Sequence, residues 1–304
     1  MIENCMTSVI NTNLASLFAQ NSLSSAQSNL ATSVQRLSSG IRINSSKDDA
    51  TGLAISMSMQ GKLNAISMAN QNAQQATNLL QTADSVVGTV QDILLRMKQL
   101  AVEGANDSIS TTQKLNVRTE LQTLEIQINK IADGTTYNGI SLLNTTANTM
   151  SFQVGSTTAT ADQFSIATID VRTGPGSGSM AMSAVGRFIA DTGTPNSLSS
   201  LTATFSNASF NTAFASLTTS LDTAIESLSS QRAMLGSQMN ALSYVNTNLL
   251  GQQANLSASK STILDTNFAD ETATLTKGQI MQQAATAMLA QANQMPNVIL
   301  SLLK

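Results

Sequence analysis

Residues 66–101, ISMANQNAQQATNLLQTADSVVGTVQDILLRMKQLA, decide the fold of this chain. Apolar residues recur along them in alternating steps of three and four, the spacing that lines up one face of an α-helix. The stripe consists of Ile66, Ala69, Ala73, Ala76, Leu80, Ala83, Val87, Val90, Leu94, Met97 and Ala101. Because a long helix of this kind is stable only when its apolar stripe is covered, the segment predicts packing against other helices.

Two further segments have the same character. Residues 117–131 carry apolar residues at helical spacing, with a capping-box pair, Ser110 and Gln113, ahead of them and Asp133-Gly134 as a stop signal behind. Residues 221–263 repeat an aliphatic residue every seven positions, which predicts partner helices and a left-handed supercoil. The repeated residues are Leu221, Leu228, Leu235, Leu242, Leu249, Leu256 and Ile263.

Both ends of the chain are periodic but almost without charge. Only Arg36 and Arg42 interrupt residues 4–46, and only Lys277 interrupts residues 272–303. A solvated helix normally carries Glu and Lys on its outer face, so we expect both ends to pair with each other and to be covered by further protein. We expect the methionines among them to fill a core. The apolar positions are Ile10, Leu14, Leu17, Leu30, Val34, Leu37 and Ile41, then Met281, Ala285, Met288, Ala292, Met295, Ile299 and Leu302.

The middle of the chain has a different pattern. Tyr137-Asn138-Gly139-Ile140 places an Asn-Gly pair between apolar residues, which predicts a hairpin turn. Residues 151–155 and 164–169 alternate as short strands do. The Gly-rich stretch 173–179 predicts a flexible link. Residues 180–214 predict a small surface excursion with scattered aromatic residues, namely Phe188, Phe205, Phe210 and Phe214.

Composition excludes most chemistry. The chain has no His, a single cysteine (Cys5), 3% aromatic residues and a net charge of −3. A Ser-His-Asp triad, a His-ligated metal site and an internal disulfide are therefore excluded, and the net charge gives no basic footprint for nucleic acid. We found no long uncharged apolar run and no signal-peptide pattern. We expect no enzymatic activity, no cofactor, no metal, no nucleic acid partner and no membrane insertion.

The two ends resemble one protein family. Residues 36–56, RLSSGIRINSSKDDATGLAIS, resemble the N-terminal signature of bacterial flagellin, the subunit of the flagellar filament. Residues 258–303 resemble its C-terminal signature, and residues 9–13 resemble its mature start. The resemblance covers residues 6–170 and 215–304 in the expected order, which makes it far more specific than a short motif.

Details of the resemblance agree in part. Gln231-Arg232 and Leu235-Gly236 resemble the family's C-terminal spoke of the inner shell. Thr262 and Ala241 stand where relatives often have Arg, and residues 1–5 precede the family's usual start. These departures concern individual salt bridges and the start of translation rather than the fold.

The resemblance implies a mainly α fold: a long antiparallel helical coiled coil formed by the N- and C-terminal segments, with a small β-hairpin region and a short outer excursion. Residues 1–45 and 265–304 would form a terminal coiled-coil domain that lines an inner tube. Residues 46–170 and 215–264 would form a helical rod domain with the hairpins, and residues 171–214 a short variable surface region.

The resemblance also implies the function. Such a chain would leave the cell unfolded through the flagellar type III channel and self-assemble, outside the cell, into a helical filament for motility. Its partners would be further copies of itself, an export chaperone, the filament cap, hook-associated proteins and a host innate immune receptor for flagellin.

We assign candidate site residues on this basis. The scarce charges Arg36, Arg42, Lys47, Asp48 and Asp49 gather around one helix junction, where they favour contacts between subunits, and the two aspartates favour the start of the next helix. The candidates for self-assembly are Leu37, Ile41, Arg42, Asn44, Asp48, Phe268, Met288, Met295, Ile299 and Leu302.

A second candidate site follows from residues 94–102, LLRMKQLAV, which resemble the patch that animal innate immune receptors detect in flagellin. By motif, Arg96, Leu100 and Glu120 would make this contact. All three lie off the apolar stripes, so we expect them to be exposed.

Two alternatives of other kinds stay open. A hook–filament junction protein shares flagellin-like helical ends but caps a structure instead of repeating, and growth of long filaments by the purified protein would decide against it. A cell-surface adhesin or glycan-binding flagellin homologue would use residues 140–214, where aromatic residues are few. A hydrolase within that region would need His or clustered carboxylates.

Overall fold

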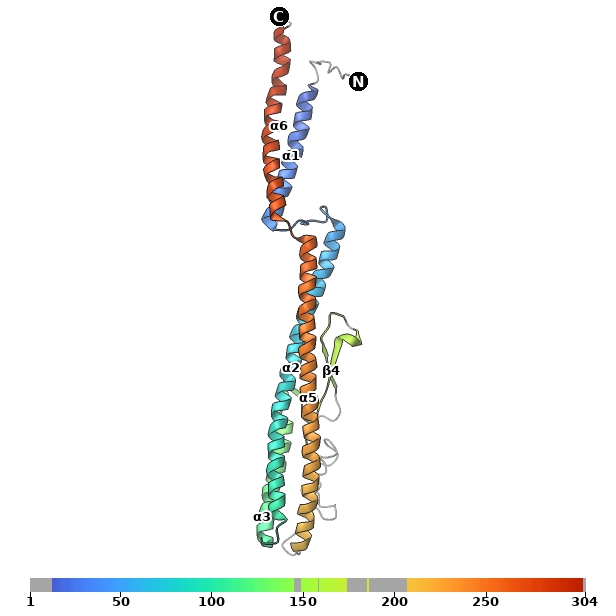
Figure 1. The fold of residues 1–304 in the computed structure, drawn as a ribbon, viewed down its shortest axis with the longest axis vertical. Coiled ribbons are helices and arrows are strands. Elements are labelled where there is room, and N and C mark those ends of the chain that lie inside the picture. The colour runs from blue at the N-terminus through green and yellow to red at the C-terminus, as the bar shows by residue number, and fades with distance from the viewer. Residues whose placement is uncertain (1–12, 145–148, 158, 174–184, 186–206, 303–304) are drawn as a thin grey trace. The chain divides into compact units, whose positions relative to one another are not determined.

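The computed structural model describes residues 13–144, 149–157, 159–173, 185 and 207–302, with side chains up to Met295 (Figure 1). It is mainly helical: α1 spans Leu14–Ser39, α2 Ala50–Gly104, α3 Thr111–Gly134, α5 Asn207–Leu264 and α6 Phe268–Leu302. Two antiparallel hairpins, β1 (Thr136–Tyr137) with β2 (Ile140–Ser141) and β3 (Thr149–Gln153) with β4 (Gln163–Ala167), complete the described part, together with the 3-10 turn Thr160–Asp162. The predicted fold class is confirmed.

The chain forms two compact units. Unit 1 contains residues 1–63 and 254–304, and unit 2 contains residues 64–253. α2 and α5 contribute to both units. Within the described residues, no helix has a stretch both long and apolar enough to cross a membrane.

The core of unit 2 is the predicted apolar stripe of α2, whose members from Ile66 to Ala101 are all buried. The heptad leucines of α5 from Leu221 to Leu249 cover this stripe, and Val117, Leu121 and Ile128 of α3 belong to the same core. Buried apolar surface of this extent is the main stabilising contribution to a helical unit.

The predicted capping box and hairpin turn are confirmed, and the two predicted strands lie within two residues of their expected positions. The Ser110 side chain accepts from the Gln113 N–H, and the Gln113 side chain accepts from the Ser110 N–H, so α3 begins with a capping box. Asn138 and Gly139 have φ of 50° and 78°, the left-handed pair that a two-residue hairpin turn requires. The β1–β2 and β3–β4 registers are set by Tyr137↔Ile140 and Phe152↔Phe164 among others.

α5 begins earlier in the chain than predicted, since helix was expected only after residue 214. It starts at Asn207, inside the range 180–214 that was assigned to a surface excursion, and Phe210 and Phe214 are fully buried. The Phe214 ring lies so close to Gly104, at the end of α2, that a side chain on this glycine would collide with it. The two aromatic residues therefore close one end of the core. Phe188, Phe205, Ile10 and Cys5 lie outside the described residues.

Candidate interaction surface

Unit 1 contains an antiparallel pair of helices with a seam of small residues. α1 and α6 pack side by side (Figure 1), as predicted for the two ends of the chain. Asn13 Nδ2 donates to the Ala292 carbonyl at 2.7 Å near one end, and Arg36 lies 3.8 Å from the Glu271 carboxylate near the other. The buried residues of the seam are Ala19, Ala26, Ser33, Ala285 and Ala292. Their small side chains let the two backbones approach closely.

Many large apolar side chains of this pair are exposed. Met281, Met288 and Met295 are 52%, 66% and 57% exposed, so the prediction that these methionines fill a core is wrong for the single chain. Two helices alone bury only small residues completely, whereas Leu30, which lies against Gly278 of α6, stays half-buried and the methionines are exposed. Other exposed apolar residues of the pair are Leu14, Leu17, Phe18, Val34, Phe268 and Ile280. A concentration of apolar surface of this kind is typical of an interaction site.

Two adjoining grooves run along the pair. One, of about 480 Å³, is lined by Phe18, by the three methionines and mainly by alanines. The other, of about 730 Å³, shares Phe18, Ser22 and Met281 with it and is more polar, since it reaches Arg36 and Glu271. The surface between the helices therefore grades from apolar to charged.

At the end of the pair that carries Arg36 and Glu271, the segment after α1 pairs with the segment before α6. Gly40 caps the C-terminus of α1; its φ of 72° is left-handed and its N–H donates to the Arg36 carbonyl. The Arg42 N–H donates to the Leu264 carbonyl at 2.7 Å, and the Thr266 N–H donates to the Gly40 carbonyl at 3.0 Å. Arg42 Nη2 also donates to the Ile263 carbonyl at 2.6 Å and thereby caps the C-terminus of α5.

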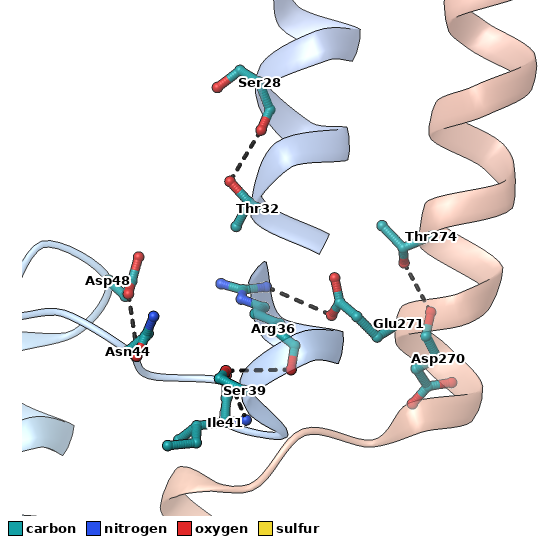
Figure 2. Close-up of polar contacts among 10 residues, drawn as sticks. All are labelled: Ser28, Thr32, Arg36, Ser39, Ile41, Asn44, Asp48, Asp270, Glu271 and Thr274. Atoms are coloured by element: carbon teal, nitrogen blue, oxygen red, sulfur yellow. Dashed lines mark hydrogen bonds and ion pairs between the residues drawn. The ribbon is translucent and has the colours of Figure 1, made fainter. Parts of the chain in front are cut away.

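The two aspartates of the junction have different tasks. Asp49 accepts from the Gly52 N–H at 2.8 Å and caps α2, so the predicted role at the start of the next helix is confirmed for this residue. Asp48 closes the loop before it by accepting from the Ser45 N–H and from the Asn44 N–H, the second of which Figure 2 shows. The bonds from Ser45 and then Asn44 lower the pKa of Asp48, which stays ionised near neutral pH.

Of the residues predicted to act in self-assembly, those from Leu37 to Asp48 lie together around the turn after α1, whereas those of α6 are spread along that helix. Leu37 and Ile41 are half-buried, whereas Arg42, Asn44 and Asp48 are exposed around the same turn. Phe268 starts α6 with 57% of its surface exposed, and Met288 and Met295 lie farther along that helix. Ile299 and Leu302 belong to α6, but their side chains lie outside the described residues.

The candidate receptor patch lies in unit 2 and is only partly as expected. Arg96 and Glu120 are both about half exposed and form an ion pair of 2.9 Å between α2 and α3. Leu100 is 2% exposed, so the expectation that it faces solvent is wrong. The reason is that α3 and α5 both pack on α2, which makes its buried face wider than a single three–four stripe.

Two buried polar residues of α3 were missed. Lys114 is fully buried and donates to the side chain of Asn211, which in turn donates to Asp107. Glu125 is 6% exposed and accepts from Thr173 Oγ1 at 3.2 Å. Burial raises the pKa of Glu125 to about 7, against the opposing effect of the hydrogen bond. Their positions gave a signal, because both continue the helical spacing of Val117 and Leu121.

A metal site would need several ligand side chains close together. Within the described ranges, no three His, Cys, Asp or Glu residues lie close enough together to hold a metal ion. The polar contacts described above cap helices and join them. The arrangement can bind protein surfaces along the α1–α6 pair.

Comparison with known proteins gives the family. Models of the bacterial flagellin N-terminal and C-terminal helical regions match residues 10–148 and 218–303. The flagellar filament 33 kDa core protein of Treponema phagedenis is 34% identical over 298 residues, 97% of this chain and 100% of that protein. The flagellin of Bacillus subtilis is 35% identical over 310 residues, 97% of this chain and 99% of that protein.

A solved structure assigned to a flagellar hook-associated protein of Vibrio parahaemolyticus has the same fold, with a TM-score of 0.55 at 13% identity, over 72% of this chain and 100% of that one. This last likeness concerns the fold alone. The two family models and the relatives that match along nearly their whole length establish that this chain belongs to the bacterial flagellin family.

Proposed function

We propose that this chain is a structural subunit of a flagellar filament outside the cell and that it polymerises with copies of itself. The observation that carries the proposal is the α1–α6 pair, whose seam buries alanines while Phe18 and the three methionines remain exposed. Membership of the flagellin family supports it. Assembly is the whole task of the chain in this proposal, and it catalyses no reaction.

The exposed side chains are sufficient for assembly only when several are covered at once. Covering one large apolar side chain contributes about 1.5–3 kcal/mol, whereas association costs about 4–15 kcal/mol in lost motional freedom. Several neighbours packed on the same pair would meet this cost. A contact between two different surfaces that does not close on itself generates an open helical polymer.

We assign parts of the chain to parts of the filament in the same way. Residues 1–45 and 265–304 would line its inner tube. Residues 46–170 and 207–264 would form the surrounding shell, since α5 begins at Asn207 and buries Phe210 and Phe214. The outward-facing part would then lie within residues 171–206. Because the α1–α6 seam completely buries only small side chains, this pair would be marginally stable in the free subunit. Such ends suit export of an unfolded chain through the type III channel with a chaperone, before assembly beneath a filament cap on hook-associated proteins.

Truncation tests the proposal. Removal of residues 272–304 deletes most of α6 and should leave a folded, soluble unit 2 that forms no filaments in electron micrographs, whereas the full chain forms long ones. Helix content and the thermal unfolding of unit 2 serve as the control for folding. Filaments from the truncated chain would contradict the proposal. Failure of the intact purified chain to grow long filaments would favour the junction protein instead.

A further inference from the structure

Three methionines form a row along α6 in unit 1. Met281, Met288 and Met295 are spaced by seven residues, and each exposes more than half of its surface. All three line the same groove, of about 480 Å³, opposite Phe18. Thioethers therefore supply a large part of the apolar surface that the proposed assembly would cover.

An exposed thioether differs chemically from the leucine that could replace it. Hydrogen peroxide transfers one oxygen atom to the sulfur; the sulfur is oxidised by two electrons, the peroxide O–O bond breaks and water leaves. The product, methionine sulfoxide, is polar, and methionine sulfoxide reductases reverse its formation with electrons from thiols. A covered thioether is protected from this reaction.

The groove offers few hydrogen-bond donors to a sulfoxide oxygen. Its lining contains five alanines, and Ser22 and Gln291 are its only residues with a side-chain hydrogen-bond donor. Three sulfoxide oxygens, each able to accept two hydrogen bonds, would share the one O–H of Ser22 and the two N–H groups of Gln291. A covered acceptor without a partner destabilises an interface. No charged residue follows Lys277 until Lys304, so charges cannot compensate along this helix.

We propose that Met281, Met288 and Met295 are a reversible oxidation site that controls assembly: peroxide oxidises them in the free subunit and blocks its incorporation, whereas the polymer shields them. The proposal rests on the proposed function, because it requires this groove to be covered by a second copy. Each oxidised methionine that the polymer would cover should raise the critical concentration for polymerisation about tenfold or more.

The chain supplies its own controls. Met97 is fully buried in the core of unit 2. Met57 and Met68 are 67% and 54% exposed but line neither groove. Oxidation of Met57 and Met68 without an effect on assembly would separate a specific role of the groove from general damage.

The experiment treats the full-length free subunit and preformed polymer with hydrogen peroxide. Mass spectrometry of peptides then measures sulfoxide at each methionine, and a sulfate salt induces polymerisation of the treated subunit. We expect sulfoxide at the three groove methionines in the free subunit and a severalfold slower reaction in the polymer. We also expect the treated subunit to lose polymerisation and to regain it after methionine sulfoxide reductase acts.

Two variants complete the test. Met281→Leu/Met288→Leu/Met295→Leu should polymerise after peroxide as before it, whereas Met57→Leu/Met68→Leu should remain as sensitive as the parent. Unchanged polymerisation of the fully oxidised parent, or equal sensitivity of the two variants, would overturn the proposal. Failure of the untreated parent to polymerise is a separate outcome, which would overturn the proposed function and this inference with it.

Discussion

Two regions of this molecule share one sequence pattern and use it differently. In unit 2 the apolar stripe of α2 is buried by α5, by α3 and by residues of the hairpin region such as Leu143 and Ile166. In unit 1 the heptads of α1 and α6 bury alanines and leave methionines exposed. The number of partner elements explains the difference, because several elements enclose a core and two helices enclose only a seam. The same periodicity therefore marks a finished core in one region and a surface for further protein in the other.

The largest difference between the regions should appear on truncation of one leucine in each. Leu228→Ala removes a side chain that is 1% exposed in unit 2 and should lower the free energy of unfolding by about 2–5 kcal/mol. Leu17→Ala removes one that is 52% exposed in unit 1 and should change it by less than about 0.5 kcal/mol. Urea unfolding of the free subunit measures both.

The two substitutions should affect assembly in the opposite order to stability. Leu17→Ala should impair polymerisation although it leaves the free subunit stable, and Leu228→Ala should impair folding first. Similar destabilisation by both substitutions would show that the α1–α6 pair already has a finished core, and the contrast between the regions would be lost.

A smaller effect concerns the buried carboxyl of unit 2. The pKa of Glu125 is raised from 4.5 to about 7 in the folded chain, so between these values the folded state holds a proton that the unfolded state has released. The free energy of unfolding should therefore fall as the pH rises through this window, by up to about 3 kcal/mol, and level off above it.

Substitution of this group checks the assignment. Glu125→Gln keeps the shape and the acceptor for Thr173 and should remove this slope, as seen in urea unfolding of unit 2 at a series of pH values. Asp48 in unit 1 is the contrast: its pKa is lowered by its hydrogen bonds and it stays ionised throughout the window. A slope that survives in Glu125→Gln would assign it to another group.

The sequence predicted what depends on local spacing. The long helices, the capping box and the Asn-Gly hairpin follow from residues close together in the chain, and the structure agrees with them. The burial of individual side chains depends on how many elements pack on a helix, and residues close together in the chain do not reveal that number. Leu100 is buried because two helices cover α2, and Met288 is exposed because α1 alone covers α6.

The other error came from weak local signals. Residues 207–214 are rich in Asn, Ser, Thr and Ala, and the four-residue spacing of Phe210 and Phe214 showed the helix only when continued into Leu217 and Leu221. The candidate interaction surface of unit 1 could also be predicted only in part. Its charged junction could be placed from the sequence, whereas the division of each heptad into seam and surface required the helix pair itself.

Within unit 2, the smallest effect on stability should come from the surface, at Arg96 and Glu120. Their ion pair of 2.9 Å joins two side chains that are each about half exposed, and such pairs contribute about 0.2–1 kcal/mol. The free energy of unfolding of Arg96→Ala should therefore lie within about 1 kcal/mol of that of the parent chain. If this pair forms the receptor contact that the resemblance of residues 94–102 implies, the same substitution should reduce signalling in a cell reporter assay for the host flagellin receptor.

The control for this contact is Lys98→Ala, which breaks another exposed ion pair of α2, that with Asp222. Reduced signalling in Arg96→Ala but not in Lys98→Ala would assign the contact to the α2–α3 side of unit 2. An unchanged response in Arg96→Ala would remove the proposed contact without affecting the account of assembly, because the α1–α6 surface lies in the other unit. Immune recognition of unit 2 and polymerisation through unit 1 therefore stand or fall separately.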